Sequence, residues 1–188
     1  MKILTVLGSP RVKGNTARVL DWVEDELRAS KHEASRIDIQ PGNMAPCSEC
    51  FVCKGVADKP GCSHQDQAVD IFNDMLFSDL TVLASPLFCW GVSAQLKTLL
   101  DRAFCLLKKG DNGNYRSLIA GRRLALVVTG GGELEGNLDL VVPPYKAFAE
   151  YFQCKDAGVL LLPYCSEPDS LGAGMEKQAR EFARKIAG

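Results

Sequence analysis

Short apolar runs alternate with amphipathic segments along nearly the whole chain. Unbroken runs such as LALVV and VLLL are typical of strands that are buried on both faces of a sheet. Segments with helical spacing of apolar residues follow these runs, which predicts parallel strands joined by helical crossovers. The predicted strands are 3–7, 34–39, 79–85, 122–130 and 158–164, and the predicted helices are 16–30, 66–77, Ser93 to about Leu107, 139–152 and the segment from Ser170 onward.

Length and composition fit one globular domain. The chain has 188 residues, of which 46% are hydrophobic, and this is enough for a single core. We therefore expect one domain over residues 1–188, with a cysteine-rich loop at 44–64. The net charge of -1 and the absence of a dense basic run argue against nucleic acid as a partner. The first apolar run has only the length of a strand, so we expect no signal peptide, no membrane span and a cytoplasmic location.

The loop GSPRVKGNT, residues 8–16, lies between the first predicted strand and the first predicted helix. Its two glycines allow the backbone to approach a ligand, and the free amides at a helix N-terminus attract an anion. The loop matches neither the Gly-Lys-Ser/Thr pattern of nucleoside triphosphate loops nor the GxGxxG pattern of dinucleotide loops. It is typical of a cradle for a terminal phosphate, unless it only turns the chain while Asn15 or Thr16 caps the helix. Its side-chain donors are Ser9, Arg11, Asn15 and Thr16.

Two further loops follow predicted strands at the same edge of the sheet. In residues 85–102, SPLFCWGVSAQLKTLLDR, Phe88 and Trp90 offer aromatic surface to a planar ligand, although such residues are more often core or subunit contacts. In residues 129–136, TGGGELEG, three consecutive glycines expose amides to ring acceptor atoms, and a mobile surface loop explains the glycines equally well. Because ligands bind beyond the carboxyl ends of parallel strands, the three loops together predict a flavin mononucleotide (FMN) site.

The same three loops resemble those of the flavodoxin-like family of NAD(P)H-dependent FMN reductases. GSPRVKGNT is similar to the family's phosphate loop, SPLFCWGVSAQLKTLLDR to its SPxYW loop and following helix, and TGG to its third loop. The resemblance runs from Met1 to about Leu162 and implies a three-layer α/β sandwich whose five-stranded parallel sheet has the order 2-1-3-4-5. Phe88 stands where the family usually has tyrosine, so the hydrogen bond of that hydroxyl is lost. The FMN-binding residues that the resemblance implies are Ser9, Arg11, Gly14, Asn15 and Thr16 at the phosphate, Ser85, Pro86, Leu87, Phe88, Trp90 and Gly91 around the ring, and Thr129, Gly130 and Gly131 at its edge.

Half of the eight cysteines fall in PCSECFVCKGVADKPGC, residues 46–62, with the spacing C-x2-C-x2-C-x8-C. Flanking prolines and glycines favour an irregular loop, and four thiolates gathered in this way can ligate an iron-sulfur cluster. The spacing resembles that of the iron-sulfur flavoproteins, a branch of the same family with a four-iron (4Fe-4S) cluster, although the last gap is longer than usual. Zinc with His64, a redox-active dithiol, and empty or oxidised cysteines are the alternatives. The predicted metal ligands are Cys47, Cys50, Cys53 and Cys62, whereas the scattered Cys89, Cys105, Cys154 and Cys165 are expected to be buried apolar thiols.

The resemblance implies an FMN-dependent oxidoreductase. NAD(P)H would reduce the flavin, and the electrons would pass to a small acceptor, namely a quinone, another flavin or an azo compound, or to the cluster. The protein would supply orientation and electric field. The alternative is an electron carrier that binds FMN and a cluster and exchanges electrons with ferredoxin or another redox protein. A homodimer or homotetramer is also implied.

Overall fold

A parallel β-sheet forms the centre of the protein, whose computed structural model describes residues 1–110, 113–167 and 170–188. The strand order is β2-β1-β3-β7-β8, and the short strand β4 pairs antiparallel with the end of β3. Since β7 and β8 are the fourth and fifth parallel strands along the chain, the predicted fold and the predicted order 2-1-3-4-5 are confirmed. The strands of this sheet are β1 (Lys2–Leu7), β2 (Glu33–Asp38), β3 (Leu80–Phe88), β4 (Gly91–Val92), β7 (Arg123–Thr129) and β8 (Lys155–Leu162).

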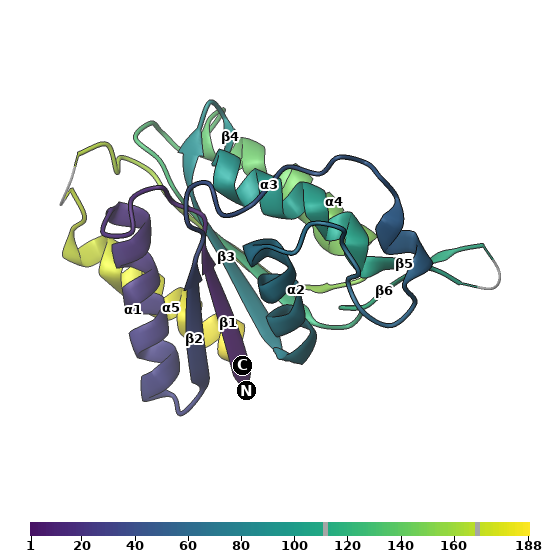
Figure 1. Ribbon diagram of the computed structural model, residues 1–188. Coiled ribbons are helices and arrows are strands. Elements are labelled where there is room, and N and C mark those ends of the chain that lie inside the picture. Colours follow the sequence, from purple (N-terminus) through teal and green to yellow (C-terminus); the bar gives the residue numbers. More distant parts are fainter. Residues whose placement is uncertain (111–112, 168–169) are drawn as a thin grey trace.

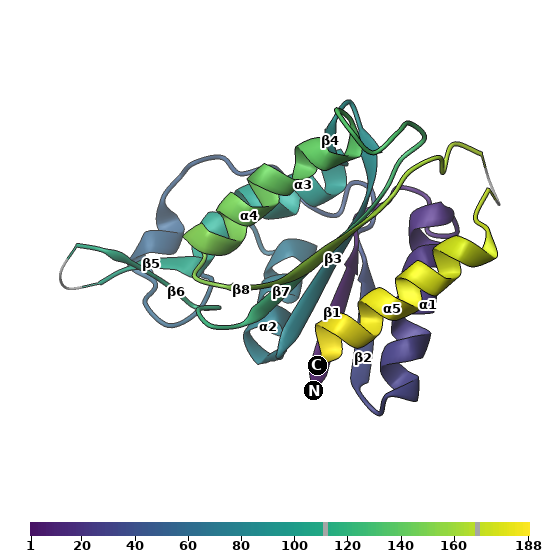
Figure 2. The same ribbon diagram turned by 180° about the vertical axis from the view of Figure 1, so that it is seen from behind.

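Helices cover both faces of the sheet, which gives the three layers visible in Figure 1 and Figure 2. One face packs against α1 and α5, and the other packs against α2, α3 and α4. The helices are α1 (Asn15–Ala29), α2 (Gln67–Phe77), α3 (Ala94–Arg102), α4 (Val142–Tyr151) and α5 (Ala173–Ala187), with short 3₁₀ helices η1 (Val52–Gly55), η2 (Ala103–Leu106) and η3 (Leu138–Val141). No helix in the described ranges is long and apolar enough to cross a membrane.

Successive side chains of β1 enter opposite cores. Ile3 and Leu7 pack on the side of α1 and α5, whereas Leu4 and Val6 pack on the side of the other three helices. All four side chains are at most 1% exposed, and burial of each contributes roughly 1.5–3 kcal/mol to folding. Burial on both faces explains why the central strands appear in the sequence as unbroken apolar runs.

The helix that starts after Ser93 is shorter than predicted. Ser93 caps α3, because its hydroxyl oxygen accepts a hydrogen bond from the Leu96 amide at 3.2 Å. The α-helix ends at Arg102, so the predicted extension to Leu107 is wrong. The chain continues through η2 into an antiparallel hairpin of β5 (Leu107–Lys109) and β6 (Tyr115–Ser117), which the sequence did not predict. Smaller differences are that β8 begins at Lys155 and α5 begins at Ala173.

Candidate functional site

Three loops meet at the carboxyl ends of β1, β3 and β7 (Figure 1). The Gly8 amide donates a hydrogen bond to the Ala84 carbonyl oxygen at 2.7 Å, and the Ser93 hydroxyl donates to the Gly8 carbonyl oxygen. The hydroxyls of Thr16 and Thr129 are hydrogen-bonded to each other at 2.7 Å, which joins the first turn of α1 to the end of β7. The loops that the sequence analysis predicted to share one ligand therefore form one connected edge.

The first turn of α1 has the form of an anion cradle. Its N-cap is Gly14 in extended conformation, and no side chain among the described residues caps it. The alternative that Asn15 or Thr16 serves as the cap is therefore wrong. The first amides of a helix have no partner within the helix, and they carry the positive end of the helix dipole. A Cβ on Gly14 would lie 3.2 Å from the Cβ of Arg11, so the turn is also tight.

The polar side chains of this loop serve different purposes. Asn15 is buried, and its amide donates to the carbonyl oxygens of Cys165 at 3.2 Å and Glu167 at 2.8 Å. It thereby holds the segment after β8 beside the cradle. The Ser9 hydroxyl pairs with the backbone of Arg11 at 3.1 Å. The side chain of Arg11 is exposed and lines a cavity of about 770 Å³ between this loop and α1, where its charge is available to an anion.

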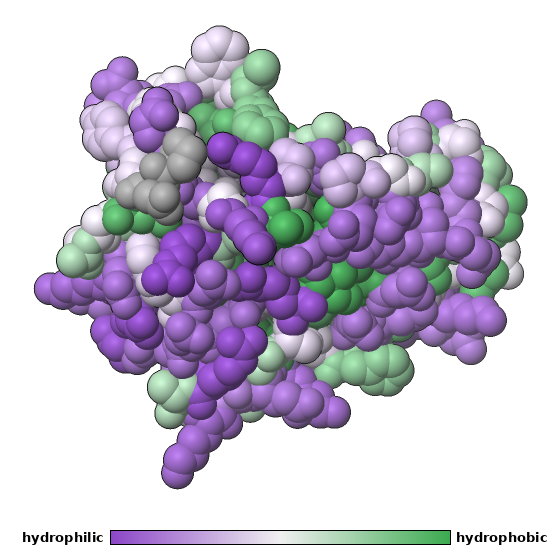
Figure 3. All heavy atoms as spheres, turned by 60° about the vertical axis from the view of Figure 1, so that its left-hand side comes forward, coloured by the Kyte–Doolittle hydropathy of each residue, from purple (hydrophilic) through white to green (hydrophobic). Residues whose placement is uncertain are grey.

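A tight hairpin connects β3 to β4. Phe88 pairs with Gly91, and the two residues between them, Cys89 and Trp90, have φ angles of 46° and 60°. This left-handed conformation is costly for residues with a side chain, and such strain is concentrated at functional sites. Phe88 is 46% exposed and Trp90 is 63% exposed, so the alternative that they are core residues is wrong. Figure 3 shows a small apolar patch at the upper edge of the face it presents, at the height of this hairpin.

Ser85 and Leu87 anchor the base of the hairpin to the rest of the fold. Ser85 is fully buried, and its hydroxyl accepts a hydrogen bond from the Ser93 amide and donates one to the Pro86 carbonyl oxygen, each at 2.8 Å. Leu87 packs against the core on the side of α2, α3 and α4. These residues position the loop, while the surface at its tip is made by Phe88, Trp90 and Gly91.

Neighbouring side chains pack closely on two of the glycines after β7. A Cβ on Gly130 would lie 2.9 Å from Leu138 Cδ1, and one on Gly132 would lie 2.2 Å from Asn137 Nδ2. The amide of Gly130 donates to the carbonyl oxygen of Leu162 at 3.1 Å, so the loop is tied to β8. Gly131 is exposed at the edge where the other two loops meet.

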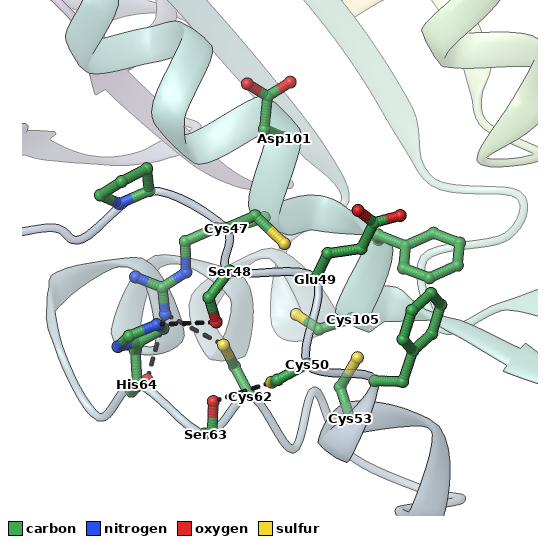
Figure 4. A pocket seen from close by; sticks show the side chains of 14 residues that line it. Cys47, Ser48, Glu49, Cys50, Cys53, Cys62, Ser63, His64, Asp101 and Cys105 are labelled. Carbon is green, nitrogen blue, oxygen red and sulfur yellow. Dashed lines mark hydrogen bonds between the residues drawn. The ribbon is translucent and has the colours of Figure 1, made fainter.

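Five cysteines surround one cavity of about 420 Å³ (Figure 4). The four predicted metal ligands, Cys47, Cys50, Cys53 and Cys62, come from the irregular segment between β2 and α2 and line this cavity together. The fifth is Cys105 in η2, which the sequence analysis assigned to the scattered thiols. Burial raises the pKa of Cys105 to about 12. The buried-thiol prediction is correct for Cys105 and Cys165 but wrong for Cys89, which is exposed at the turn of the β3–β4 hairpin. It also missed that the Cys105 thiol lines the cavity, because a contact across more than forty residues leaves no local pattern.

Three cations hold the cysteine loop against the segment after α3. Arg102 has no exposed side-chain surface and pairs with Asp66. The ammonium of Lys108 donates to the carbonyl oxygens of Cys53 and Pro60, each at 3.0 Å. The ammonium of Lys54 lies 3.3 Å from the ring centroid of Phe104 and donates to the Phe104 and Leu107 carbonyl oxygens. Burial lowers the pKa of both ammonium groups.

The thiols around the cavity have different environments. The Ser63 hydroxyl pairs with Cys50 Sγ at 3.2 Å and lowers the pKa of that exposed thiol. Burial raises the pKa of Cys53. In the described part of the chain, no three His, Cys, Asp or Glu side chains converge closely enough to hold a single metal ion. The side chain of His64, the alternative zinc ligand, lines the same cavity.

An apolar pocket of about 480 Å³ lies between the hairpin and the helices α3 and α4. Phe88 and Trp90 form one side of it, and Tyr145 and Phe148 of α4 form another. Asp101 of α3 lines both this pocket and the cysteine cavity. The pocket therefore lies between the predicted flavin-ring loop and the cysteines.

Comparison of the sequence with known proteins identifies the family of the chain. The sequence model of NADPH-dependent FMN reductase matches residues 1–140. An iron-sulfur flavoprotein of Methanocaldococcus jannaschii is 24% identical over 142 residues, which are 76% of this chain and 67% of that protein. An iron-sulfur flavoprotein of Archaeoglobus fulgidus is 31% identical over 131 residues, which are 70% of this chain and 60% of that protein. The chain thus spans about two thirds or less of the length of these relatives.

A solved structure extends the likeness to the whole chain. The FMN-dependent NADH-azoreductase from Bacillus anthracis, in complex with FMN, matches with a TM-score of 0.74 at 16% identity, and the match covers 100% of both chains. This likeness shows the fold, whereas the sequence model covers the β1, β3 and β7 loops themselves. The family predicted from the three loops is therefore confirmed: the chain belongs to the NADPH-dependent FMN reductase family.

Proposed function

We propose that the protein is an oxidoreductase that binds FMN at the joined edge of β1, β3 and β7 and accepts electrons from NAD(P)H. The observation that carries the proposal is that hydrogen bonds join the three strand ends. The Gly8 amide donates to the Ala84 carbonyl oxygen, and the hydroxyls of Thr16 and Thr129 bond to each other. Ligands of parallel α/β sheets bind at such an edge. Membership of the family, and the FMN named in the azoreductase structure, support the same cofactor.

The residues at this edge fit FMN. The phosphate would be held by the first amides of α1 and by Arg11, in a loop that contains no carboxylate. The ring would lie beside Phe88 and Trp90, with Gly130 and Gly131 at its edge. When bound, FMN supplies the hydride and single-electron chemistry. The chain binds and orients the cofactor, and its amides and helix dipole stabilise negative charge.

The proposed electron acceptor is a small molecule, namely a quinone, another flavin or an azo compound. The apolar pocket beside the hairpin, lined by Phe88, Trp90 and Phe148, supports an acceptor of this chemistry, because flat apolar molecules gain most from burial against aromatic side chains. The structural neighbour from Bacillus anthracis is an azoreductase, which supports an acceptor of this class.

We further propose that Cys47, Cys50, Cys53 and Cys62 hold a 4Fe-4S cluster. Four thiols that line one cavity offer the soft ligands that a polynuclear iron-sulfur cluster requires. The names of the relatives support this assignment. The group would accept and donate single electrons, and the loop would keep its ligands together through the contacts of Lys108 and Arg102.

Anaerobic purification with quantification of FMN, iron and sulfide per chain tests both proposals. We expect one FMN per chain, about four irons with matching sulfide, and rapid oxidation of NAD(P)H when a quinone, a flavin or an azo dye is present. FMN without iron after cluster reconstitution would contradict the cluster but leave the reductase. A protein that binds no FMN would contradict the proposal as a whole.

A second candidate function is an electron carrier that exchanges electrons with ferredoxin or another redox protein. It is favoured by the exposure of Cys47, Cys50 and Phe51, because a cluster held there would lie within reach of a protein partner. Slow oxidation of NAD(P)H with every simple acceptor, combined with rapid reduction by reduced ferredoxin, would favour the carrier.

We also propose that the protein forms a homodimer or homotetramer. Sedimentation of the FMN-loaded protein tests this oligomeric state.

A further inference from the structure

Arg102 is the last residue of α3, and its guanidinium lies in the wall of the cysteine cavity. Its side chain has no exposed surface. Nη2 donates to Cys62 Sγ at 3.3 Å and to the His64 carbonyl oxygen at 3.1 Å. A permanently charged group at the end of a helix thus contacts the sulfur of a predicted cluster ligand.

The other half of the guanidinium is fixed by one carboxylate. Nη1 donates to Asp66 Oδ1 at 2.6 Å and to the Ala45 carbonyl oxygen at 3.2 Å. Asp66 accepts in turn from the amides of Ala45 at 3.0 Å and Ala68 at 3.2 Å, and through the latter it caps α2. Residues on both sides of the cysteine loop are therefore clamped to α3 through this ion pair.

Buried charge is expensive unless it is compensated. Asp66 compensates one positive charge, and Arg102 Nε is buried without a hydrogen-bond partner in the described part of the chain. The ammonium groups of Lys54 and Lys108 add two further positive charges beside the cavity and donate to backbone carbonyl oxygens. The wall also contains the carboxylates of Glu49 and Asp101, but Asp101 already pairs with Lys97. Three cationic side chains, Arg102, Lys54 and Lys108, therefore lie in or beside the wall of the cavity, together with the carboxylate of Glu49.

We propose that Arg102 is a positioning residue that holds Cys62 in place and raises the reduction potential of the group bound by the cysteines. The inference rests on the cluster of the proposed function. Reduction adds one electron, supplied by the reduced flavin or by a mediator, and no proton, so the bound group gains one negative charge. A hydrogen bond to a ligand sulfur and a nearby fixed cation favour the more negative state. Arg102 supplies both.

The test compares the midpoint potential of the iron-sulfur cluster in the purified, FMN-loaded wild type with that in R102K and R102Q. The potential is measured by a mediator titration followed by electron paramagnetic resonance, and iron is counted per FMN. We expect R102Q to bind FMN normally, to hold less iron and to have a lower potential. We expect R102K to have a smaller downward shift, because lysine keeps the charge but loses the rigid two-armed donor.

The variant R122Q is the matched control, because it removes the same type of side chain just before β7, away from the cysteine cavity, where Arg122 donates to the Leu76 carbonyl oxygen. Its cluster potential should equal that of the wild type. Full iron content and an unchanged potential in both Arg102 variants would overturn the inference. If R102Q binds FMN but no iron, the potential of R102K is the deciding measurement. An unchanged cluster potential in R102K would then overturn the inference. A wild type that lacks iron after reconstitution would instead refute the proposed cluster. This outcome can be told apart from a failure of the Arg102 inference, which requires a wild type that holds iron.

Discussion

At the scale of single residues, polar side chains of the predicted site differ in how far the folded chain already engages them. Ser85 and Asn15 are buried, and each is engaged by neighbouring loops. The sequence analysis predicted both as FMN-binding residues. It could not predict that they also hold neighbouring loops together, because a hydrogen-bonding residue in a ligand loop has the same local pattern whether or not it makes such contacts. Arg11 is exposed beside the first turn of α1, and it is therefore the side chain on which a phosphate contact can be tested.

The substitution Arg11→Ala should weaken FMN binding and leave the fold intact. A hydrogen bond from a charged donor contributes about 1.5–3 kcal/mol, so the dissociation constant should rise about 10- to 100-fold. Titration of the apoprotein with FMN, followed by flavin fluorescence, measures this constant, and circular dichroism checks the fold. An unchanged affinity would refute the phosphate assignment.

The substitution Cys50→Ser should remove iron and retain FMN. Cys50 lies in the cysteine cavity, whereas the loops at the joined edge make their own contacts through Gly8 and Thr16. Metal analysis and the flavin absorption of the anaerobically purified variant give both contents. Cys154→Ser, which changes a thiol outside the cavity lining, is the control and should keep both groups. Stoichiometric iron in the Cys50 variant would exclude this residue as a ligand.

At the scale of elements, the sequence predicted what is determined locally. The central strands β1, β3 and β7 contain the long apolar runs, since both of their faces are buried, and the strand order follows from the family resemblance. The end of α3 could not be predicted in this way. Leu106 and Leu107 are buried and continue the helical spacing of apolar residues, but Lys108 binds carbonyl oxygens of the cysteine loop. That contact favours an extended strand, and it joins segments far apart in the sequence.

The packing of α3 on β1 depends on a missing side chain. A Cβ on Gly8 would lie 2.6 Å from Leu96 Cβ and 3.3 Å from the Ala84 carbonyl oxygen. Gly8→Ala should therefore lower the free energy of unfolding by about 1–3 kcal/mol, and the melting temperature by about 2–4 °C for each kcal/mol. Thermal unfolding followed by circular dichroism measures the change.

The matched control for this substitution is Gly174→Ala in the first turn of α5, where an added Cβ meets no atom within 4 Å. Alanine loses less conformational freedom than glycine on folding, so this variant should be stabilised by up to about 1 kcal/mol. Equal effects of the two substitutions would show that the close approach at Gly8 does not govern the packing of α3.

At the scale of the whole molecule, the proposed cofactor and the fold should stabilise each other. The phosphate cradle, the hairpin and the glycine loop belong to different parts of the chain, and Thr16 and Thr129 join two of them. The cysteine cavity combines distant segments in the same way, through Arg102 and Asp66. Such long-range contacts are what the sequence could not display. Because a ligand that bridges these loops binds only the folded chain, its affinity adds to stability.

FMN at 100 times its dissociation constant should add about 2.7 kcal/mol to the free energy of unfolding, which corresponds to a rise of about 5–10 °C in melting temperature for a chain of this size. Riboflavin at the same concentration should give a smaller rise, because it lacks the phosphate that the first turn of α1 and Arg11 would hold. In Arg11→Ala the difference between FMN and riboflavin should shrink, since one of the phosphate contacts is gone. Differential scanning calorimetry of the apoprotein with each ligand measures these shifts. Equal stabilisation of the wild type by FMN and riboflavin would mean that the loop after β1 does not bind the phosphate, whatever the ring contacts are.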